Sequence, residues 1–82
     1  MDYQIVAVKV GNREGVAQDM QRILTENGCA IKVRLGLHDL PANACSPAGL
    51  VLMEVEGEKS EIQAMVKKLD ALPETKAMHI VI

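Results

Sequence analysis

Residues 9–28 read KVGNREGVAQDMQRILTENG, and this stretch joins the end of a strand, a tight loop and an amphipathic helix. A mostly β-branched apolar run, Ile5 to Val10, precedes the loop. Gly28 follows the helical stretch at the place where a helix C-cap favours a positive φ. Apolar residues recur at helical spacing between the loop and that glycine, at Val16, Met20, Ile23 and Leu24. The stretch therefore predicts one strand–helix unit.

The rest of the chain repeats this plan. Leu50 to Val55 reads as a strand, Gly57 as a break, and a second helix is predicted to end before Pro73. Its apolar stripe consists of Ile62, Met65, Val66, Leu69 and Leu72. Further apolar runs lie at 29–37, between the two units, and at 75–82.

The predicted order is β-α-β-β-α-β, in which both helices must cover the same sheet face. This is the ferredoxin-like α+β sandwich. Connection handedness then predicts a four-stranded antiparallel sheet of order 4-1-3-2. We expect one domain over residues 1–82. A chain of this length buries only roughly 60% of its unfolded surface, so we also expect a homo-oligomer, a dimer or tetramer.

Composition argues against nucleic-acid and membrane partners. Tyr3 is the one aromatic residue, the net charge is −2 and the isoelectric point is near 5.6, whereas single-strand binders offer aromatic rings and positive charge. No stretch approaches the ~20 apolar residues of a membrane span, and the N-terminus leads straight into a strand. We expect a complete cytoplasmic chain. Cys29 and Cys45 are expected to be reduced.

Strand alternation divides the residues between two sheet faces. One set from each strand is expected beneath the helices. In the first strand this is the even-numbered set, Val6, Val8 and Val10. In the second and third strands it is the odd-numbered set: Cys29, Ile31, Val33, Leu35 and Leu37, and Val51, Met53 and Val55. The other face would then carry an apolar patch, Tyr3, Ile5, Ala7, Leu50 and Leu52, ringed by Lys32, Arg34, Glu54 and Glu56. Lys32 should lie near Glu54. Such a patch predicts a contact surface between chains, through the face or through the edge strand, although scattered exposed aliphatic residues are ordinary.

Four segments carry a resemblance to known families. The segment 12–16, NREGV, followed by Ile23-Leu24 and Gly28, resembles the first strand–helix turn of ACT-type regulatory domains. The segments RLGLH at 34–38, CSPAGL at 45–50 and EG at 56–57 resemble small ACT-like regulators of the iron-only hydrogenase system. The likeness covers essentially the whole chain. It implies a regulatory module that binds a small effector, such as an amino acid, or a protein partner.

The resemblance to ACT domains implies an effector site lined by Asn12, Gly15 and Val16. A physical reason supports it, because glycine permits close approach and a helix N-terminus offers free N–H groups to a carboxylate. The alternative is structural. Asn12 is a good N-cap, and Gly15 would also permit close packing against a strand.

His38 begins a long loop, residues 38–49, and Cys45 lies within it. The two residues are candidates for a divalent transition-metal site. The C-terminal domain of nickel-responsive repressors is a more distant likeness, with a cysteine in a similar place. Two ligands are too few, so Asp39, or His79 of another chain, would have to complete the site. Alternatively, Cys45 packs as a small hydrophobe and His38 is a surface residue.

Enzymatic functions fit less well. Acylphosphatases use an arginine in the first loop, where Arg13 is present, but their asparagine on the third strand is missing. Copper chaperones need a Cys-x-x-Cys that this loop lacks. Cys45 as a nucleophile would have His38 as its one sequence neighbour able to act as a base. We therefore predict a non-enzymatic, ACT-like regulatory homo-oligomer, with a metal sensor using His38 and Cys45 as the alternative.

Overall fold

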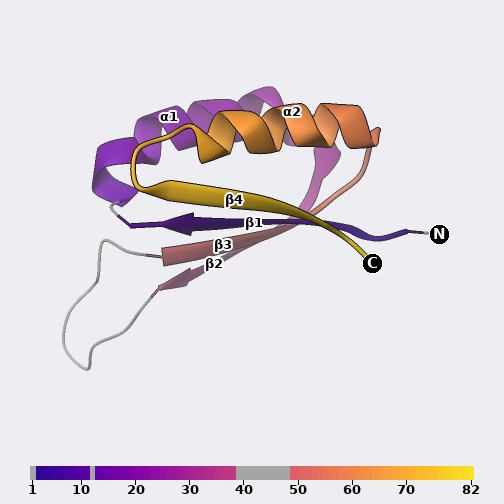
Figure 1. Cartoon of the computed structure of the whole chain (residues 1–82), viewed down its shortest axis with the longest axis horizontal. Helices are drawn as coiled ribbons and strands as arrows, with labels where there is room; N and C mark the ends of the chain where they lie inside the picture. The colour runs from indigo at the N-terminus through magenta and orange to yellow at the C-terminus, as the bar shows by residue number, and fades with distance from the viewer. Residues whose placement is uncertain (1, 12, 39–48) are drawn as a thin grey trace.

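The chain folds as one four-stranded antiparallel sheet with two helices on the same face, as the computed structural model shows for residues 2–11, 13–38 and 49–82 (Figure 1). The sheet order is β2-β3-β1-β4. This is the predicted order 4-1-3-2, and it confirms the ferredoxin-like α+β fold. The elements are β1 (Gln4–Val10), α1 (Arg13–Glu26), the short 3-10 helix η1 (Gly28–Ala30), β2 (Ile31–His38), β3 (Gly49–Val55), α2 (Lys59–Asp70) and β4 (Thr75–Val81).

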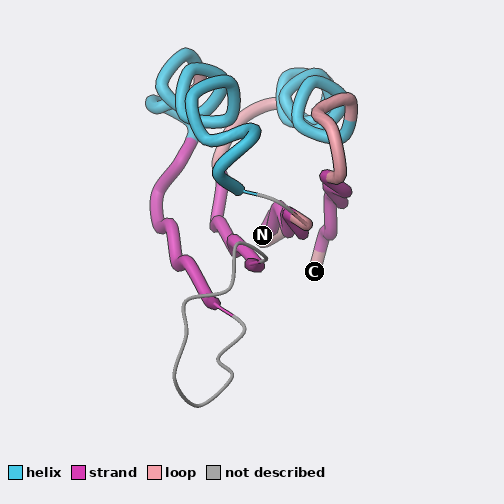
Figure 2. The backbone as a smooth tube through the Cα atoms, turned by 90° about the vertical axis from the view of Figure 1, so that its left-hand side faces the viewer, coloured by secondary structure: helices cyan, strands magenta, loops and turns pink. Residues whose placement is uncertain are grey.

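A single core lies between the helices and the sheet. Its fully or nearly fully buried members come from β1, α1, β3 and α2, and Figure 2 shows both helices stacked over one side of the strands. They are Val6, Val8, Val10, Val16, Met20, Ile23, Leu24, Met53, Val55, Ile62, Met65 and Leu69. The helical spacing in α1 and α2 and the alternation in β1 therefore predicted the core correctly.

The edge strand β2 contains a β-bulge that the sequence did not predict. Ile31 pairs with Val55, but the next pair along the strand is Val33 with Glu54, so Lys32 and Val33 together face one residue of β3. One extra residue on a strand shifts every later side chain to the opposite face. Only the start of β2 therefore has the predicted phase.

Val33, Arg34 and Leu35 consequently lie on the faces opposite to those predicted. Val33 and Leu35 were expected beneath the helices, yet they are exposed by 56% and 52% on the uncovered face. Arg34 was expected on the uncovered face, but it pairs with the buried Met53, and its Nη1 donates a hydrogen bond to Gln21 Oε1 of α1 at 3.2 Å. A long arginine side chain can extend along the partly covered edge of the sheet to reach solvent.

The C-terminus of α1 also differs from the prediction. Gly28 does not adopt a positive φ; among the described glycines, Gly57 has one, at 148°. The Asn27 side-chain amide donates to the Ile23 carbonyl at 2.8 Å, and the chain continues into η1. The Ile23 carbonyl thus accepts from both the backbone N–H and the side-chain amide of Asn27. Cys29, expected under the helices, is an exposed free thiol in η1.

The bulge makes a testable distinction between two leucines. Leu24→Ala should lower the free energy of unfolding by about 2–5 kcal/mol, because it leaves a cavity in the core. Leu35→Ala should lower it by less than about 1 kcal/mol, since half of that side chain is already in water. Chemical denaturation at concentrations low enough to keep the chain monomeric measures both. Equal losses would mean that Leu35 lies beneath the helices and that the bulge is absent.

Candidate functional site

The sheet face opposite the helices, here called the open face, carries a continuous apolar patch across all four strands. The patch follows from strand alternation, because the buried residues of β1 and β3 point the other way. Its members are Tyr3, Ile5, Ala7, Val33, Leu35, Leu50, Leu52, Met78, Ile80 and Ile82. We call this set the apolar patch.

The strand register arranges the patch in rows that run across the sheet. In one row Leu35 pairs with Leu52, Leu52 with Ala7, and Ala7 with Met78. The next row consists of Val33, Glu54, Ile5 and Ile80, in the same strand order. Five large apolar side chains of the patch are each more than half exposed: Tyr3, Val33, Leu35, Met78 and Ile82. An apolar surface of this extent is typical of a contact site.

The sequence predicted the centre of this patch and missed its two sides. Val33 and Leu35 were missed because the bulge in β2 reverses their direction. Met78 and Ile80 were missed because the sequence analysis did not assign the residues of β4 to the two sheet faces. The alternation of residues in the stretch 75–82 could have predicted their face. Pairing of Ile5 with Ile80 places those side chains on the open face.

The two ends of the open face carry opposite charge. At one end Glu54 and Glu56 share a single lysine, Lys32, whose Nζ lies 3.5 Å and 3.9 Å from their carboxylate oxygens. The predicted approach of Lys32 to Glu54 is thereby confirmed. Beside them is a hollow of about 150 Å³, whose lining includes Asp2 and Tyr3. Asp2 is already paired with Lys59 of α2 at 3.6 Å.

The other end is basic. Lys9 of β1 pairs directly with Lys76 of β4 in the strand register. Both follow the alternation of β1 onto the open face, and neither makes an ion pair with any residue that the structure describes. Like charges directly across two strands are destabilising. The open face therefore has an apolar centre, an acidic end and a basic end.

The predicted effector residues are placed only in part. Asn12 lies outside the described residues. Gly15 is an exposed residue in the first turn of α1, whereas Val16 is 2% exposed and belongs to the core. The effector site at this turn stays a prediction, and Val16 would contribute to it from within the core.

The predicted metal ligands cannot be placed together. Cys45 lies outside the described residues, and His38 ends β2 with only its backbone described. The exposed Cys29 lies beside a hollow of about 250 Å³ lined also by Glu26, Glu56 and Glu61. Even so, among the side chains that the structure describes, no three of His, Cys, Asp or Glu come close enough to hold a metal ion.

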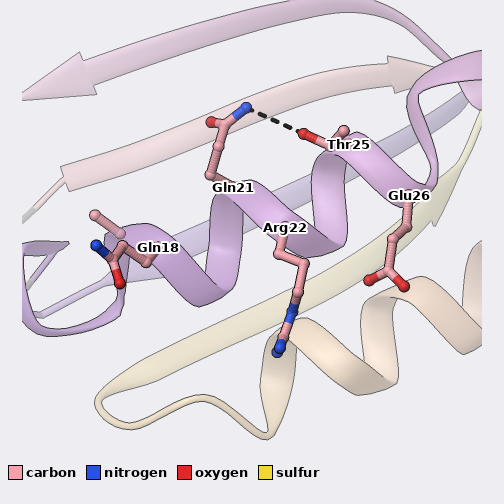
Figure 3. A pocket seen from close by; sticks show the side chains of 6 residues that line it. Gln18, Gln21, Arg22, Thr25 and Glu26 are labelled. Atoms are coloured by element: carbon pink, nitrogen blue, oxygen red, sulfur yellow. Dashed lines mark hydrogen bonds between the residues drawn. The ribbon is translucent and has the colours of Figure 1, made fainter.

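A further hollow lies on the outer surface of α1. Its volume is about 590 Å³, and its lining residues all belong to that helix. In Figure 3 Gln21 and Thr25 point to one side of the helix, joined by a hydrogen bond of 3.4 Å, while Arg22 and Glu26 point to the other. The hollow is space between exposed side chains on one helix and lacks a wall from a second element.

Comparison with known proteins supports the fold and goes no further. No protein-family model and no curated protein matches the chain. Among solved structures, an uncharacterized protein from Thermotoga maritima is similar, with a TM-score of 0.82 and 16% sequence identity. The match covers 100% of this chain and 99% of the other. Separately, no helix in the described residues is both long and apolar enough to cross a membrane.

The metal prediction is tested by preparing the protein without chelator and measuring bound transition metal by mass spectrometry. A site that uses His38 and Cys45 should bind metal in a fixed ratio to the chain and lose it in Cys45→Ser, because the thiolate is one of its ligands. Cys29→Ser is the matched control and should retain the metal. Metal-free wild-type protein that also fails to bind added zinc or nickel would contradict the prediction.

The effector prediction is tested by a thermal-shift screen of amino acids. A ligand that binds only the folded chain raises the melting temperature. In Gly15→Val the shift should disappear while the unliganded melting temperature changes little, since Gly15 is exposed. Ala17→Val, at an exposed position one residue beyond the buried Val16, is the control and should keep the shift. No stabilisation of the wild type by any amino acid would contradict an amino-acid sensor.

Proposed function

We propose that the chain is a non-enzymatic, ACT-like regulatory module that acts as a homo-oligomer assembled through the open face. The apolar patch is the observation that carries this proposal. Side chains of the patch such as Met78 and Ile80 are exposed to water, because the helices cover only the opposite face of the sheet. A second copy would remove this surface from water, at roughly 25 cal/mol per Å² of apolar area.

The face is a better candidate for assembly than the edge strand β2. An edge strand joins another chain most readily when it is long, flat and regular. The bulge at Lys32 and Val33 interrupts the pairing pattern of β2, and its exposed lysine is a common protection against edge-to-edge pairing. Arg34, which the sequence placed in the interface, points to the helix side and would take no part in a face contact.

The regulatory role rests on the sequence resemblance and on the chemistry of the exposed surface. A surface dominated by aliphatic side chains suits binding to protein, whereas base stacking needs aromatic rings. The likeness to regulators of the iron-only hydrogenase system names the process in which we propose that the module acts. Because the proposed interface is also the main apolar surface, an effector or partner would regulate by shifting the balance between free and assembled copies.

Leu52→Asp tests the assembly directly. Leu52 lies in the middle of the apolar patch, between Leu35 and Ala7. A carboxylate there would be desolvated on assembly, so the dissociation constant should rise about a hundredfold or more. Sedimentation equilibrium measures the constant. Ala64→Asp, at an exposed position on α2, is the matched control and should assemble as the wild type does.

Two outcomes would contradict the proposal. A wild-type chain that remains a monomer at tens of micromolar would remove the oligomer altogether. An oligomer that tolerates Leu52→Asp, with the variant shown to be folded by circular dichroism, would assign assembly to another surface.

A further inference from the structure

We infer that two copies pack open face to open face about a two-fold axis that crosses the strands, so that the basic end of each copy lies on the acidic end of the other. This inference rests on the proposed self-association and adds its geometry. The occupant of the open face is a second copy of this chain. Lys9 of one copy approaches Glu56 of its partner, and the same contact occurs twice in each dimer because a two-fold interface is self-complementary.

The small size of the face favours a contact that includes its charged ends. Three of the four strands are seven residues long and β2 is eight. At about 4.8 Å between strands and ~3.3 Å per residue, the sheet covers about 19 by 23 Å, or roughly 440 Å² in projection. Stable interfaces of standard size bury about 800 Å² of accessible surface on each partner. The whole face, charged ends included, is thus no larger than a small interface in projection, and a contact confined to the apolar centre would be smaller still.

The basic end has no paired carboxylate among the described residues. Lys9 and Lys76 are direct neighbours across β1 and β4, and no carboxylate in the described part of the chain pairs with either. Their mutual repulsion destabilises the free chain. A carboxylate supplied by another molecule at this place would remove that cost, so the end is suited to an acidic partner surface.

The acidic end has the complementary imbalance. Glu54 and Glu56 share Lys32, which leaves one of the two carboxylates without a cation of its own. Glu56 is the farther of the two from the lysine, and its side chain is 78% exposed. The hollow of about 150 Å³ beside it has room for the end of a lysine side chain. The acidic end is thus suited to a basic partner surface.

Symmetry decides which arrangement satisfies both ends. A two-fold axis along the strands would place each row of one face on the same row of the other, with the two lysine rows together. An axis across the strands reverses the order of rows, so the lysine row of each copy lies over the glutamate end of its partner. The apolar rows then meet in the middle. The strands of two stacked sheets also cross at about 30°. This crossing brings β1 of one copy over the neighbouring strand β3 of the other.

A charge exchange between Lys9 and Glu56 tests this geometry. Sedimentation equilibrium of the full chain gives the dissociation constants of the wild type, Lys9→Glu, Glu56→Lys and the double variant. Each single variant should raise the constant by about tenfold, because an attraction becomes a repulsion at two places in the dimer. The double variant should return close to the wild-type value. Lys68→Glu, an exposed lysine on α2, is the charge-matched control and should have no effect.

The outcomes distinguish a failure of this dimer geometry from a failure of the proposed assembly. Recovery in the double variant, together with weaker wild-type association at high salt, supports the crossed two-fold axis. If Leu52→Asp disrupts assembly but Lys9→Glu behaves like Lys68→Glu, the face is the interface and this arrangement is wrong. Association that strengthens with salt would indicate like ends together and would overturn the inference. A wild-type monomer, or an assembly through a strand edge, overturns the geometry and the proposed assembly alike. Circular dichroism of each variant establishes that it is folded.

Discussion

Burial of one sheet face beneath two helices is the constraint on which the rest of the structure depends. The two amphipathic helices have their apolar stripes turned toward the same side of the sheet, where they meet β1 and β3. Among the described residues no third layer covers the other side. Alternation then places every second residue of each strand in water unless another molecule covers it. Many of those residues, from Tyr3 to Ile82, are apolar, so the uncovered face is a candidate contact surface.

The β-bulge in β2 alters the composition of the open face more than any other local feature. Without it, Arg34 would lie on that face, with Val33 and Leu35 under α1. With it, two apolar side chains join the patch and the guanidinium lies beside Gln21. The same bulge makes β2 a poor edge for strand addition. One inserted residue therefore favours contact through the face and disfavours contact through the edge.

Much of the fold was predictable because periodicity and burial agree. Val6, Val8 and Val10 alternate with outward residues, and Met20, Ile23 and Leu24 recur with a helical period, so each pattern had one consistent placement. The bulge was not predictable from pattern. Apolar residues alternate without interruption from Ile31 to Leu35, and because both faces of this sheet accept apolar side chains, a one-residue slip leaves no trace in the sequence. The C-terminus of α1 was missed for a different reason: the chain continues into the 3-10 helix η1, and Gly28 lies in η1 without a positive φ. The site predictions at Asn12 and Cys45 concern residues outside those described, so they rest on sequence alone.

The central claim is that the open face contacts a second copy of the chain. Isotope-filtered nuclear Overhauser spectroscopy on a mixture of methyl-labelled and unlabelled chains tests it most directly, because only contacts between copies are recorded. The account predicts intermolecular signals at the methyl groups of Leu52, Met78 and Ile80, and none at the buried Met65. Intermolecular signals confined to the helix surfaces, or to protons of an edge strand, would contradict it.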